Sequence, residues 1–462
     1  MNKKVAFLTL GCKVNSYETD AMNKLFLDKG YEVVDFNSVA DIYVVNTCSV
    51  TNMADRKSRQ MLHKARKNNG KALIVATGCY VQASAIEASK DEAIDLLIGN
   101  NKKKEIVDIV EQYIETQTNN MEIIDINDTN VNIEYEDMQI DSTGENTRAY
   151  IKIQDGCNQF CSYCIIPYAR GRIRSRQKDS ILNEVQALAI NGYKEIVLTG
   201  IHISSYGLDF EEEKVKGFKY EYLLEVIENI SKIEGIKRIR LGSLEPRIIT
   251  EEFIKKLSKI DKVCPHFHLS LQSGCDETLN RMNRKYTTNE YEMGCNILRK
   301  YFDNPAITTD VIVGFAGETD EEFDKTVKFL EKINFAEMHI FKYSIRKGTV
   351  AAKMPNQVNE EIKTQRSKVL LEMNEKNHKE YMESFVLKEE FVLIEEEVLI
   401  ENKRYYVGHN ERYLKILIEK KCNTEQQDSL ENKIIKVKIT ELFDSQRLIG
   451  ENCEQDKNCT MI

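Results

Sequence analysis

The length, composition and charge of the chain already exclude several classes of protein. At 462 residues the chain is too long for one ordinary hydrophobic core, so we expect two to four domains. The hydrophobic fraction of 42% is typical of a globular protein, and no apolar run approaches the roughly 18 residues that span a bilayer. The first residues are too soon interrupted for a signal peptide, so we expect a cytoplasmic protein whose 12 cysteines are metal ligands or core thiols rather than disulfides.

The distribution of charge is uneven along the chain. The net charge of −9 argues against a protein that coats nucleic acid by bulk electrostatics. Residues 121–145 carry acids without Lys or Arg, whereas residues 56–71 and 170–178 carry only basic charges. Local basic patches can guide an RNA on an acidic protein, although each patch is equally explained as a solvated helix face.

Residues 1–117 have the rhythm of a small α/β domain. The short apolar runs VAFLTL, DIYVVN and ALIVAT follow one another at intervals of about 30 residues or slightly more, the length of a strand–helix–strand unit. This spacing predicts a parallel sheet covered by helices. The acidic, Asn-rich and Thr-rich residues 118–146 have weak periodicity, which indicates a linker.

Residues 147–372 resume the alternation of strands and helices. Six strands are predicted in chain order at 149–153, 195–199, 237–242, 266–271, 307–315 and 337–343. Amphipathic helices separate them, and one of these begins at a capping box formed by Thr319 and Glu322. The pattern favours a partial TIM-type (β/α)6 barrel.

Residues 373–450 begin in a charged helical stretch and then become rich in strands. Five short β-rich runs follow one another within about 65 residues. They predict a small antiparallel β-barrel of the OB-like kind, a frequent RNA-binding platform, and residues 451–462 form a polar tail.

The segment GCNQFCSYC carries the strongest local signal for chemistry. It places Cys157, Cys161 and Cys164 in a C-x3-C-x2-C arrangement directly after the first barrel strand. Three thiolates can hold three irons of a [4Fe–4S] cluster and leave the fourth iron open for the amino and carboxylate groups of S-adenosylmethionine (SAM). A three-cysteine zinc site is the alternative, but it needs a fourth ligand that is not evident nearby.

A second set of cysteines is dispersed in the sequence. Cys12, Cys48 and Cys79 each follow the end of one strand of the first domain. The carboxyl ends of parallel strands lie along one edge of a sheet, so these thiols are expected to converge on an auxiliary [4Fe–4S] cluster. Gly11 and Gly78 directly precede two of them and would allow tight turns. Each cysteine taken alone is more simply explained as a core thiol.

Four stretches around these cysteines resemble the radical SAM methylthiotransferases. They are LGCKVNSYE, VVNTCSVTNMADRKSR, TGCYVQ and IQDGCNQFCSYCIIPYARGRIRSR. The resemblance covers nearly the whole chain and implies an N-terminal methylthiotransferase domain, a radical SAM core and a C-terminal TRAM domain. It also implies two [4Fe–4S] clusters and SAM as cofactors.

The family has three branches, which differ in substrate. They act on isopentenyladenosine in tRNA, on an aspartate of a ribosomal protein, or on N6-threonylcarbamoyladenosine at tRNA position 37. The GCKVN around Cys12 is similar to the third branch, whereas the first usually reads GCQMN. The resemblance implies that one SAM donates a methyl group to sulfur. A second SAM supplies the radical that removes hydrogen from carbon 2 of the adenine, where the methylthio group is then attached. The implied partners are the anticodon stem-loop of tRNA, a sulfur donor and a flavodoxin or ferredoxin as electron donor. We expect the enzyme to be a monomer that does not bind membranes.

Other residues are candidates for contacts to SAM or RNA. The SAM candidates, at strand ends or in turns, are Tyr163, Thr199, Gly200, Ser243, Glu245, Gln272, Gly314 and Gly317, each of which could instead only structure its loop. The candidates for tRNA phosphates are Arg56, Lys57, Arg59, Arg170, Arg172, Arg174 and Arg176. Arg172 and Arg174 could instead pair with carboxylates at the barrel mouth. In the terminal barrel, Tyr405, Tyr406, Arg412 and Tyr413 are candidates for base stacking, although strand aromatics are more often core residues.

Two other functions compete with methylthiolation of tRNA. The same clusters could act on a ribosomal protein, and the cysteines could hold structural zinc in an RNA-binding protein without catalysis. The remaining six cysteines show no comparable order, so no function is assigned to them: Cys264, Cys275, Cys295, Cys422, Cys453 and Cys459.

Overall fold

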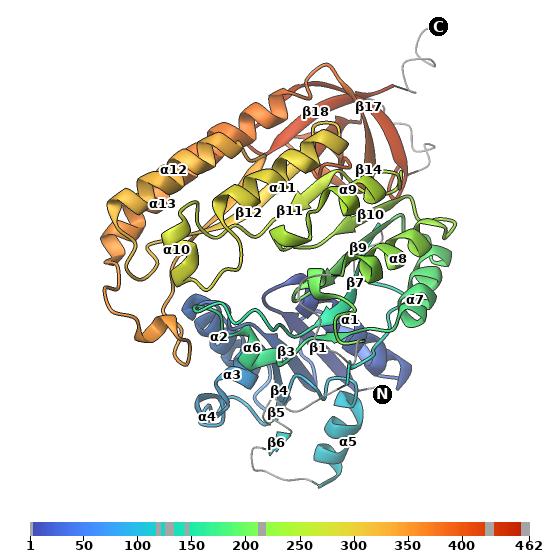
Figure 1. The fold of residues 1–462 in the computed structure, drawn as a ribbon. Helices are drawn as coiled ribbons and strands as arrows, with labels where there is room; N and C mark the ends of the chain where they lie inside the picture. The colour runs from blue at the N-terminus through green and yellow to red at the C-terminus, as the bar shows by residue number, and fades with distance from the viewer. Residues whose placement is uncertain are drawn as a thin grey trace, which may run out of the picture.

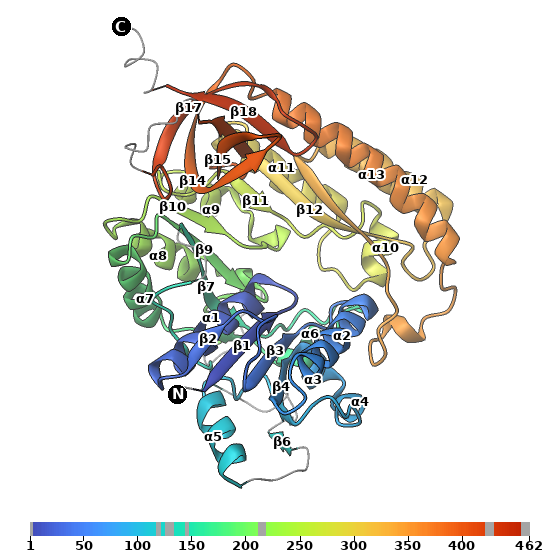
Figure 2. The same cartoon turned by 180° about the vertical axis from the view of Figure 1, so that it is seen from behind.

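A computed structural model describes residues 3–116, 122–124, 134–143, 147–210, 219–420 and 429–453. The chain forms three stacked bodies (Figure 1). An N-terminal α/β domain lies at the bottom, a large open barrel lies in the middle and a small closed barrel lies at the top, and the view from behind shows the same order (Figure 2). Within the described ranges, no helix is long and apolar enough to span a membrane.

The N-terminal domain is a six-stranded, fully parallel sheet. The strand order is β2-β1-β3-β4-β5-β6. The strands are β1 (Lys4–Thr9), β2 (Glu32–Val34), β3 (Ile42–Thr47), β4 (Leu73–Gly78), β5 (Leu96–Ile98) and β6 (Glu122–Ile124). The helices are α1 (Lys13–Asp28), α2 (Asn52–Asn68), α3 (Cys79–Ala83), α4 (Ala85–Ala88) and α5 (Ile106–Thr116).

The three predicted strands of this domain are confirmed as β1, β3 and β4. The central strand β3 is buried along its whole length, as expected of a parallel sheet with helices on both faces. The sequence pattern missed β2, β5 and β6, which have three residues each and are too short to show a period.

The segment predicted as a linker is partly built into the structure. Strand β6 lies within it and extends the N-terminal sheet. Residues 134–143 pack against both neighbours, because the Tyr17 hydroxyl bonds to the carbonyl of Met138 and Glu184 accepts from the Ile140 amide at 2.6 Å. Weak periodicity therefore reflects irregular backbone held by side chains. The other positions of 118–146 lie outside the described residues.

The central body contains all six predicted parallel strands. They are β7 (Arg148–Asp155), β9 (Glu195–Gly200), β10 (Arg238–Leu241), β11 (His266–His268), β12 (Ala306–Val313) and β13 (Glu337–Lys342). Strands β10-β9-β7 form one sheet and strands β11-β12-β13 form another. Isolated β-bridges near β10 and β11 connect the two sheets. A two-residue strand, β8 (Arg174–Ser175), pairs antiparallel with β7.

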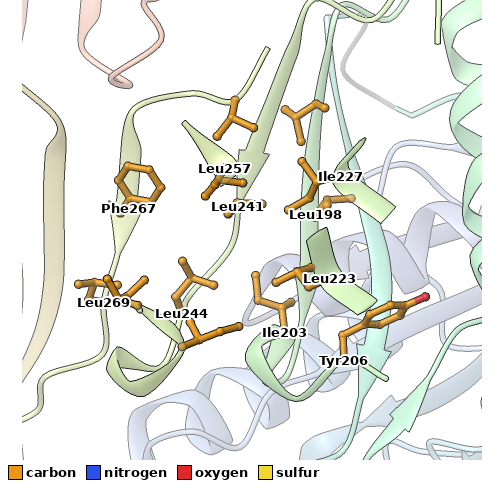
Figure 3. Packing of buried hydrophobic residues seen from close by; sticks show 14 of the residues in the cluster. Leu198, Ile203, Tyr206, Leu223, Ile227, Leu241, Leu244, Leu257, Phe267 and Leu269 are labelled. Atoms are coloured by element: carbon orange, nitrogen blue, oxygen red, sulfur yellow. The ribbon is translucent and has the colours of Figure 1, made fainter. Parts of the chain in front are cut away.

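The helices of the central body cover its outer face. They are α7 (Lys178–Ile190), α8 (Tyr220–Ser231), α9 (Glu251–Leu257), α10 (Asp276–Arg281), α11 (Thr288–Tyr301) and α12 (Asp320–Ile333), whereas the short helix α6 (Ile166–Arg170) lies against α3 of the N-terminal domain. The predicted capping box of Thr319 and Glu322 is present at α12. Alternate strand residues such as Leu198, Leu241 and Phe267 point outward into the hydrophobic core under these helices (Figure 3). The other half of the strand residues therefore faces the barrel interior.

The C-terminal barrel is closed by five strands. They are β14 (Glu389–Ile400), β15 (Lys403–His409), β16 (Lys415–Glu419), β17 (Ile434–Leu442) and β18 (Arg447–Asn452), in the order β14-β15-β16-β18-β17. This is an OB-like barrel, with one parallel pair, β16 and β18, among the antiparallel ones. The predicted boundary at residue 372 lies inside α13 (Glu360–Glu383), which packs on β13 and joins the two barrels.

Tyr413 closes the end of the large barrel that faces the small one. Its ring lies between the guanidinium groups of Arg148 and Arg240, at 4.9 and 4.8 Å from the ring centroid. Both arginines pair with buried Glu195 at 2.8 Å. Cation–π contacts and a shared carboxylate thus fix the small barrel to the large one.

Candidate functional site: two cysteine trios at a domain interface

The first trio, Cys157, Cys161 and Cys164, lies on the loop between β7 and α6. Backbone hydrogen bonds fold this loop onto itself and onto the next segments, from the Cys157 amide to the Gly171 carbonyl and from the Ser162 amide to the Met282 carbonyl, both at 3.0 Å. The three side chains are partly exposed and line one cavity of about 200 Å³. The loop therefore presents three thiols to a common space.

Burial favours the protonated form of two thiols of this trio. Burial raises the pKa of the Cys157 thiol to about 11, and the neighbouring Cys161 raises it further. Burial also raises the pKa of Cys164. Arg284 donates to the Cys161 sulfur at 3.2 Å. Thiols in such an environment ionise when a metal replaces their protons.

The second trio, Cys12, Cys48 and Cys79, assembles from three strand ends. Cys12 precedes α1, Cys48 follows β3 and Cys79 begins α3 after β4. Each thiol acts electrostatically on the others: Cys79 and Cys12 both raise the pKa of Cys48, although burial is the larger cause of its rise to about 11. The structure thus brings together the cysteines that the sheet topology predicted.

Two glycines make this convergence sterically possible. Gly11 has a φ of +107°, and a Cβ there would lie 2.9 Å from the Cys48 sulfur. Gly78 has a φ of +100°, and a Cβ there would lie 2.4 Å from the Thr47 carbonyl oxygen. No other residue fits either position, because both the backbone conformation and the space exclude a side chain.

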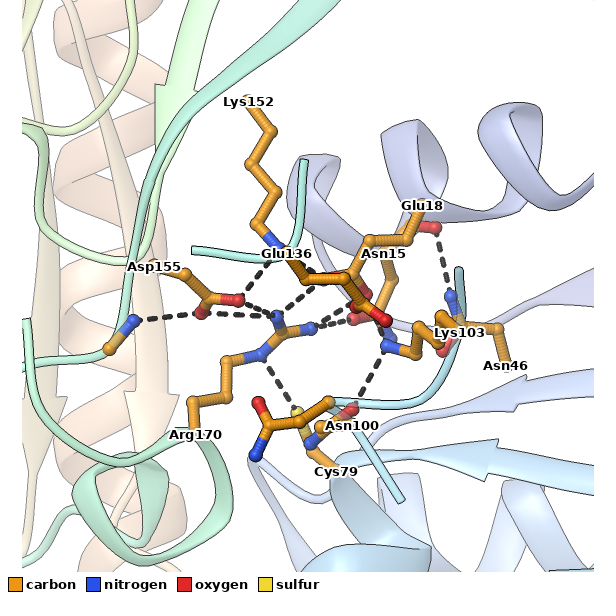
Figure 4. A network of polar contacts seen from close by, with 12 residues as sticks. Asn15, Glu18, Asn46, Cys79, Asn100, Lys103, Glu136, Lys152, Asp155 and Arg170 are labelled. Atoms are coloured by element: carbon orange, nitrogen blue, oxygen red, sulfur yellow. Dashed lines mark hydrogen bonds and ion pairs between the residues drawn. The ribbon is translucent and has the colours of Figure 1, made fainter. Parts of the chain in front are cut away.

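Arg170 connects the two trios. It ends α6, the helix that directly follows the first trio, and α6 packs against α3 of the second. Its Nε donates to the Cys79 sulfur at 3.3 Å, and its terminal nitrogens bind Glu18 at 2.7 Å and Asn15 at 2.6 Å. Figure 4 shows this guanidinium between the two domains.

A buried charge network surrounds Arg170. Lys103 and Lys152 pair with Glu18, and Lys152 also pairs with Asp155 at 2.6 Å. Burial alone would raise the pKa of Glu18, but Arg170, Lys103 and Lys152 hold it well below its usual range. The carboxylate therefore stays ionised and fixes the N-terminal domain to the large barrel.

The donor sets fit two iron–sulfur clusters, each with one open iron. Each trio offers three thiols, and one sulfur of each trio accepts a hydrogen bond from an arginine. A carboxylate acts on each trio, Glu245 on the first and Asp55 on the second, and His202 also lines the cavity of the first trio. An arginine donating to a sulfur in each site suits anionic thiolates and sulfides. Three thiolates with an open fourth position are not the set expected of a structural zinc site.

The cavity beside the first trio has groups for a polar ligand. Of the predicted SAM residues, Tyr163, Ser243, Glu245 and Gln272 line it. The Glu245 side chain is 3% exposed, and its Oε2 has no hydrogen-bond partner within the described ranges. An orphaned carboxylate oxygen in a cavity is suited to accept from an ammonium group. Gln272 has a φ of +75°, a strained conformation for a residue other than glycine.

Four other predicted SAM residues lie outside this lining. Thr199 and Gly200 end β9 directly before the lining residue Ile201. Gly314 packs under the Lys363 side chain, where a Cβ would lie 2.3 Å from its Cγ, and Gly317 faces Arg281. The loop-structuring alternative accounts for these two glycines in the structure.

Sequence reasoning missed two ionisable residues of the cavity, His202 and Arg284. His202 lines the cavity, and burial, together with Arg284 and Arg247, lowers its pKa to about 3, so its imidazole is neutral at pH 7. The position of His202, two residues after Gly200, was an available signal. Arg284 reaches the trio from the turn after α10, and no motif or spacing in the sequence points to it.

Five of the eleven predicted RNA contacts are buried, and a sixth, Tyr413, packs between two arginines, which disfavours a role in RNA binding for these six. Arg170 and Arg176 are at most 1% exposed, and Arg176 pairs with Glu184 and Asp137. Arg174 is also buried and pairs with Asp155, as the alternative allowed. Tyr405 and Tyr406 belong to the core of the small barrel, and Tyr413 closes the large one.

The other predicted RNA contacts differ in exposure. Arg412 is mostly buried and bonds to the carbonyls of Asp303 and Asn304, so it is also structural. Arg56, Lys57 and Arg59 are exposed on α2, and Arg172 is exposed beside the Phe160 ring.

Comparisons with known proteins agree with this arrangement. Residues 4–99 match the family described as uncharacterized protein family UPF0004, and residues 151–330 match the radical SAM superfamily. A radical SAM methyltransferase, TsrM from Kitasatospora setae, has a similar fold, with a TM-score of 0.55 and 15% identity over 74% of this chain and 75% of that one.

Sequence similarity to relatives with assigned functions covers most of the chain. The threonylcarbamoyladenosine tRNA methylthiotransferase MtaB of Bacillus subtilis is 41% identical over 94% of this chain and 93% of its own. The protein of the same name from Aquifex aeolicus is 43% identical over 82% and 90%. A tRNA-2-methylthio-N(6)-dimethylallyladenosine synthase of Thermoanaerobacter sp. is 36% identical over 80% and 77%. The chain therefore belongs to the family of radical SAM methylthiotransferases.

Proposed function

We propose that this enzyme attaches a methylthio group to carbon 2 of N6-threonylcarbamoyladenosine at position 37 of tRNA. The observation that carries the proposal is the pair of cysteine trios joined through Arg170. Two adjacent open clusters are what sulfur insertion into an unactivated C–H bond requires, one for the radical and one for the sulfur. The relatives named for this substrate, at 38–43% identity, support the choice of nucleoside.

Each trio has a distinct task in this proposal. Cys157, Cys161 and Cys164 would hold the cluster that binds SAM, and Glu245 Oε2 would accept from the SAM ammonium group. Cys12, Cys48 and Cys79 would hold the auxiliary cluster. When bound, the clusters and SAM supply an electron, a 5′-deoxyadenosyl radical, a methyl group and a site for sulfur.

Side chains around the two cysteine trios stabilise the charge of the cluster ligands and hold the two sites in place. Arg170 and Arg284 each donate to a ligand sulfur and thereby stabilise its anionic form. The neutral His202 adds polarity to the cavity without adding charge. The charge network between Glu18 and Asp155 holds the two trios at a fixed separation, so that a substrate between them meets both.

Binding of tRNA is assigned to the exposed basic side chains of α2 and to the small barrel. Arg56 and Lys57 lie on the helix that follows Cys48, so phosphate contacts there would bring the anticodon loop to the auxiliary site. We further propose a cytoplasmic enzyme that receives electrons from a flavodoxin or ferredoxin and sulfur from a separate donor.

Mass spectrometry of tRNA nucleosides tests the function directly. The anaerobically reconstituted protein, supplied with SAM and a reductant, should convert N6-threonylcarbamoyladenosine to its 2-methylthio derivative. Product only on isopentenyladenosine would reassign the substrate, in keeping with relatives named for dimethylallyladenosine at 35–36% identity. An unchanged tRNA with a methylthiolated ribosomal protein would reject the tRNA function.

A further inference from the structure

The interior of the large barrel is lined by polar and charged side chains. Along the strands, alternate residues that do not enter the hydrophobic core point inward, including Arg148 on β7, Arg240 on β10, His268 on β11 and Asp310 on β12. In a packed TIM barrel such positions carry bulky aliphatic side chains. The polar lining therefore indicates that the interior holds a polar ligand.

Three of these side chains form a compact cluster. His268, Asp310 and His339 each place a nitrogen or oxygen within 4.8 Å of the others. Asp310 and His339 are paired in register on β12 and β13, the rings of His268 and His339 stack at 5.8 Å, and His268 Nε2 lies 3.4 Å from the Asp310 carboxylate. His339 is exposed, so the cluster is open to a ligand on that side.

Lys13 enters the same interior from the N-terminal domain. It directly follows Cys12, and its ammonium lies 5.7 Å from the centroid of the Tyr150 ring on β7. Its side chain is exposed to solvent, yet no carboxylate in the described ranges lies within ion-pair distance of it. Lys13 is thus a cation beside the auxiliary site that is available to an anion.

The surrounding charges leave the interior positive. Arg148, Arg238 and Arg240 all share the single carboxylate of Glu195, and Arg148 also pairs with Glu395. The positive charge also acts on His266. Burial, Arg240 and Lys13 together hold the pKa of this histidine well below its usual range. A ligand that brings a negative charge is favoured in this environment.

We infer that Lys13 and the cluster of His268, Asp310 and His339 form the subsite that recognises the amino-acid side chain of the substrate nucleoside. In this subsite Lys13 pairs with a carboxylate, and the cluster exchanges hydrogen bonds with a hydroxyl group. The inference rests on the proposed function, because a threonylcarbamoyl group carries both of these groups. A purely hydrocarbon substituent on the adenine would shield Lys13 from water without giving it an anionic partner, which disfavours such a substituent.

A metal ion is the competing occupant of the cluster. Two imidazoles and a carboxylate are possible ligands for zinc. His268 Nδ1 bonds to Thr308 at 3.0 Å, an arrangement that either occupant allows. The positive interior disfavours a cation, and only an anionic ligand explains Lys13 together with the cluster. Direct contact with the substrate therefore accounts for both Lys13 and the cluster.

Binding of synthetic anticodon stem-loops separates these alternatives. The cluster-loaded protein is titrated anaerobically with RNAs carrying N6-threonylcarbamoyladenosine, its methyl ester, or an analogue in which 2-aminobutyrate replaces threonine and removes the hydroxyl. We expect the free acid to bind about tenfold to a hundredfold more tightly than the ester, as for a charge-assisted hydrogen bond. K13Q should abolish this preference, and H339L should abolish the preference for the hydroxyl.

Controls keep the outcomes distinct. Iron and sulfide content of K13Q shows whether the neighbouring Cys12 still holds its cluster, and K71Q, a change at an exposed lysine of the same domain, should leave both preferences intact. A K13Q protein that still prefers the acid over the ester overturns the inference. The inference is also overturned if the wild type holds one equivalent of zinc that H339L lacks, and H339L still prefers the RNA that carries the hydroxyl. Absence of methylthiolation by the wild type on the acid RNA would instead reject the proposed function.

Discussion

The two cysteine trios reach similar chemistry by different routes. Cys157, Cys161 and Cys164 occupy one loop, so their spacing in the sequence is also their arrangement in space. Cys12, Cys48 and Cys79 come from three strand ends, and only the parallel order β1-β3-β4 brings them together. The first site is a property of a short segment, whereas the second is a property of the folded sheet.

This difference predicts unequal dependence on the rest of the protein. The loop trio is supported by a few backbone hydrogen bonds, and its cavity is completed by residues from β9 to α10. The sheet trio depends on Gly11 and Gly78 and on Arg170, which reaches it from the other domain. Substitutions at each site should therefore have separable effects.

The largest expected effect comes from removing one ligand at each site. C157A should abolish reductive cleavage of SAM, because the cluster that binds it loses a ligand. C48A should retain most of that cleavage yet lose methylthiolation, because only the auxiliary cluster is lost. Iron content should fall from about eight to about four per chain in either variant.

C295A is the matched control for both cysteine variants. Cys295 is fully buried in the core under the barrel helices and belongs to neither trio. Its variant should keep both clusters and both activities. Methylthiolation by C48A would contradict the assignment of the auxiliary site, and unchanged SAM cleavage by C157A would contradict that of the first.

Loss of Arg170 should weaken the connection between the two sites. R170M leaves Glu18 and Asp155 buried with fewer cations, and breaking a buried ion network from one side costs about 3–5 kcal/mol. We expect a lower urea midpoint for the transition that includes the N-terminal domain. The electron paramagnetic resonance signal of the auxiliary cluster should shift more than that of the SAM cluster, because Arg170 donates to the sulfur of Cys79, a ligand of the auxiliary cluster.

R404M provides the comparison for a surface arginine. Arg404 pairs with Glu397 at the surface of the small barrel, so its removal should change stability by less than about 1 kcal/mol. Equal urea midpoints for R170M and the wild type would show that the network does not hold the domains together.

The contrast between a local site and a site assembled by the fold also explains which features could be predicted from the sequence. The cluster loop, the six barrel strands and the five strands of the small barrel could be predicted, because spacing and alternation are local. The role of Arg170 could not, since it lies in a run of basic residues that resembles a phosphate-binding patch, and its partner Glu18 is 152 positions away. Tyr413 was misleading for a similar reason: its ring meets Arg148 and Arg240 only after the two barrels dock.

Acid should weaken the contact between the two barrels. Burial raises the pKa of Glu195, but Arg240 and Arg148 outweigh it and hold the pKa well below the usual range. A carboxyl with a depressed pKa contributes stability above its unfolded pKa of about 4 and loses it as the pH falls further. Below about pH 4, the free energy of unfolding of the metal-free protein should fall by about 1.4 kcal/mol per pH unit because this group is protonated in the unfolded state.

E195Q tests the assignment of that pH dependence. The variant removes the titrating group, so its stability should be lower at pH 7 and should depend less steeply on pH below 4. An equal slope for the variant and the wild type would place the acid sensitivity elsewhere, for instance at Glu18.

The smallest expected effect concerns the exposed charges of α2. Arg56 and Lys57 lie on a helix surface near Cys48, in contrast to the buried Arg170, Arg174 and Arg176. The double variant R56Q/K57Q should weaken tRNA binding severalfold and reduce the slope of log affinity against log salt by about one to two. Its unfolding midpoint should stay unchanged, because neither side chain is buried. If the salt slope does not change, the tRNA approaches the auxiliary site along another surface, and the exposed Arg172 beside the first trio becomes the next position to test.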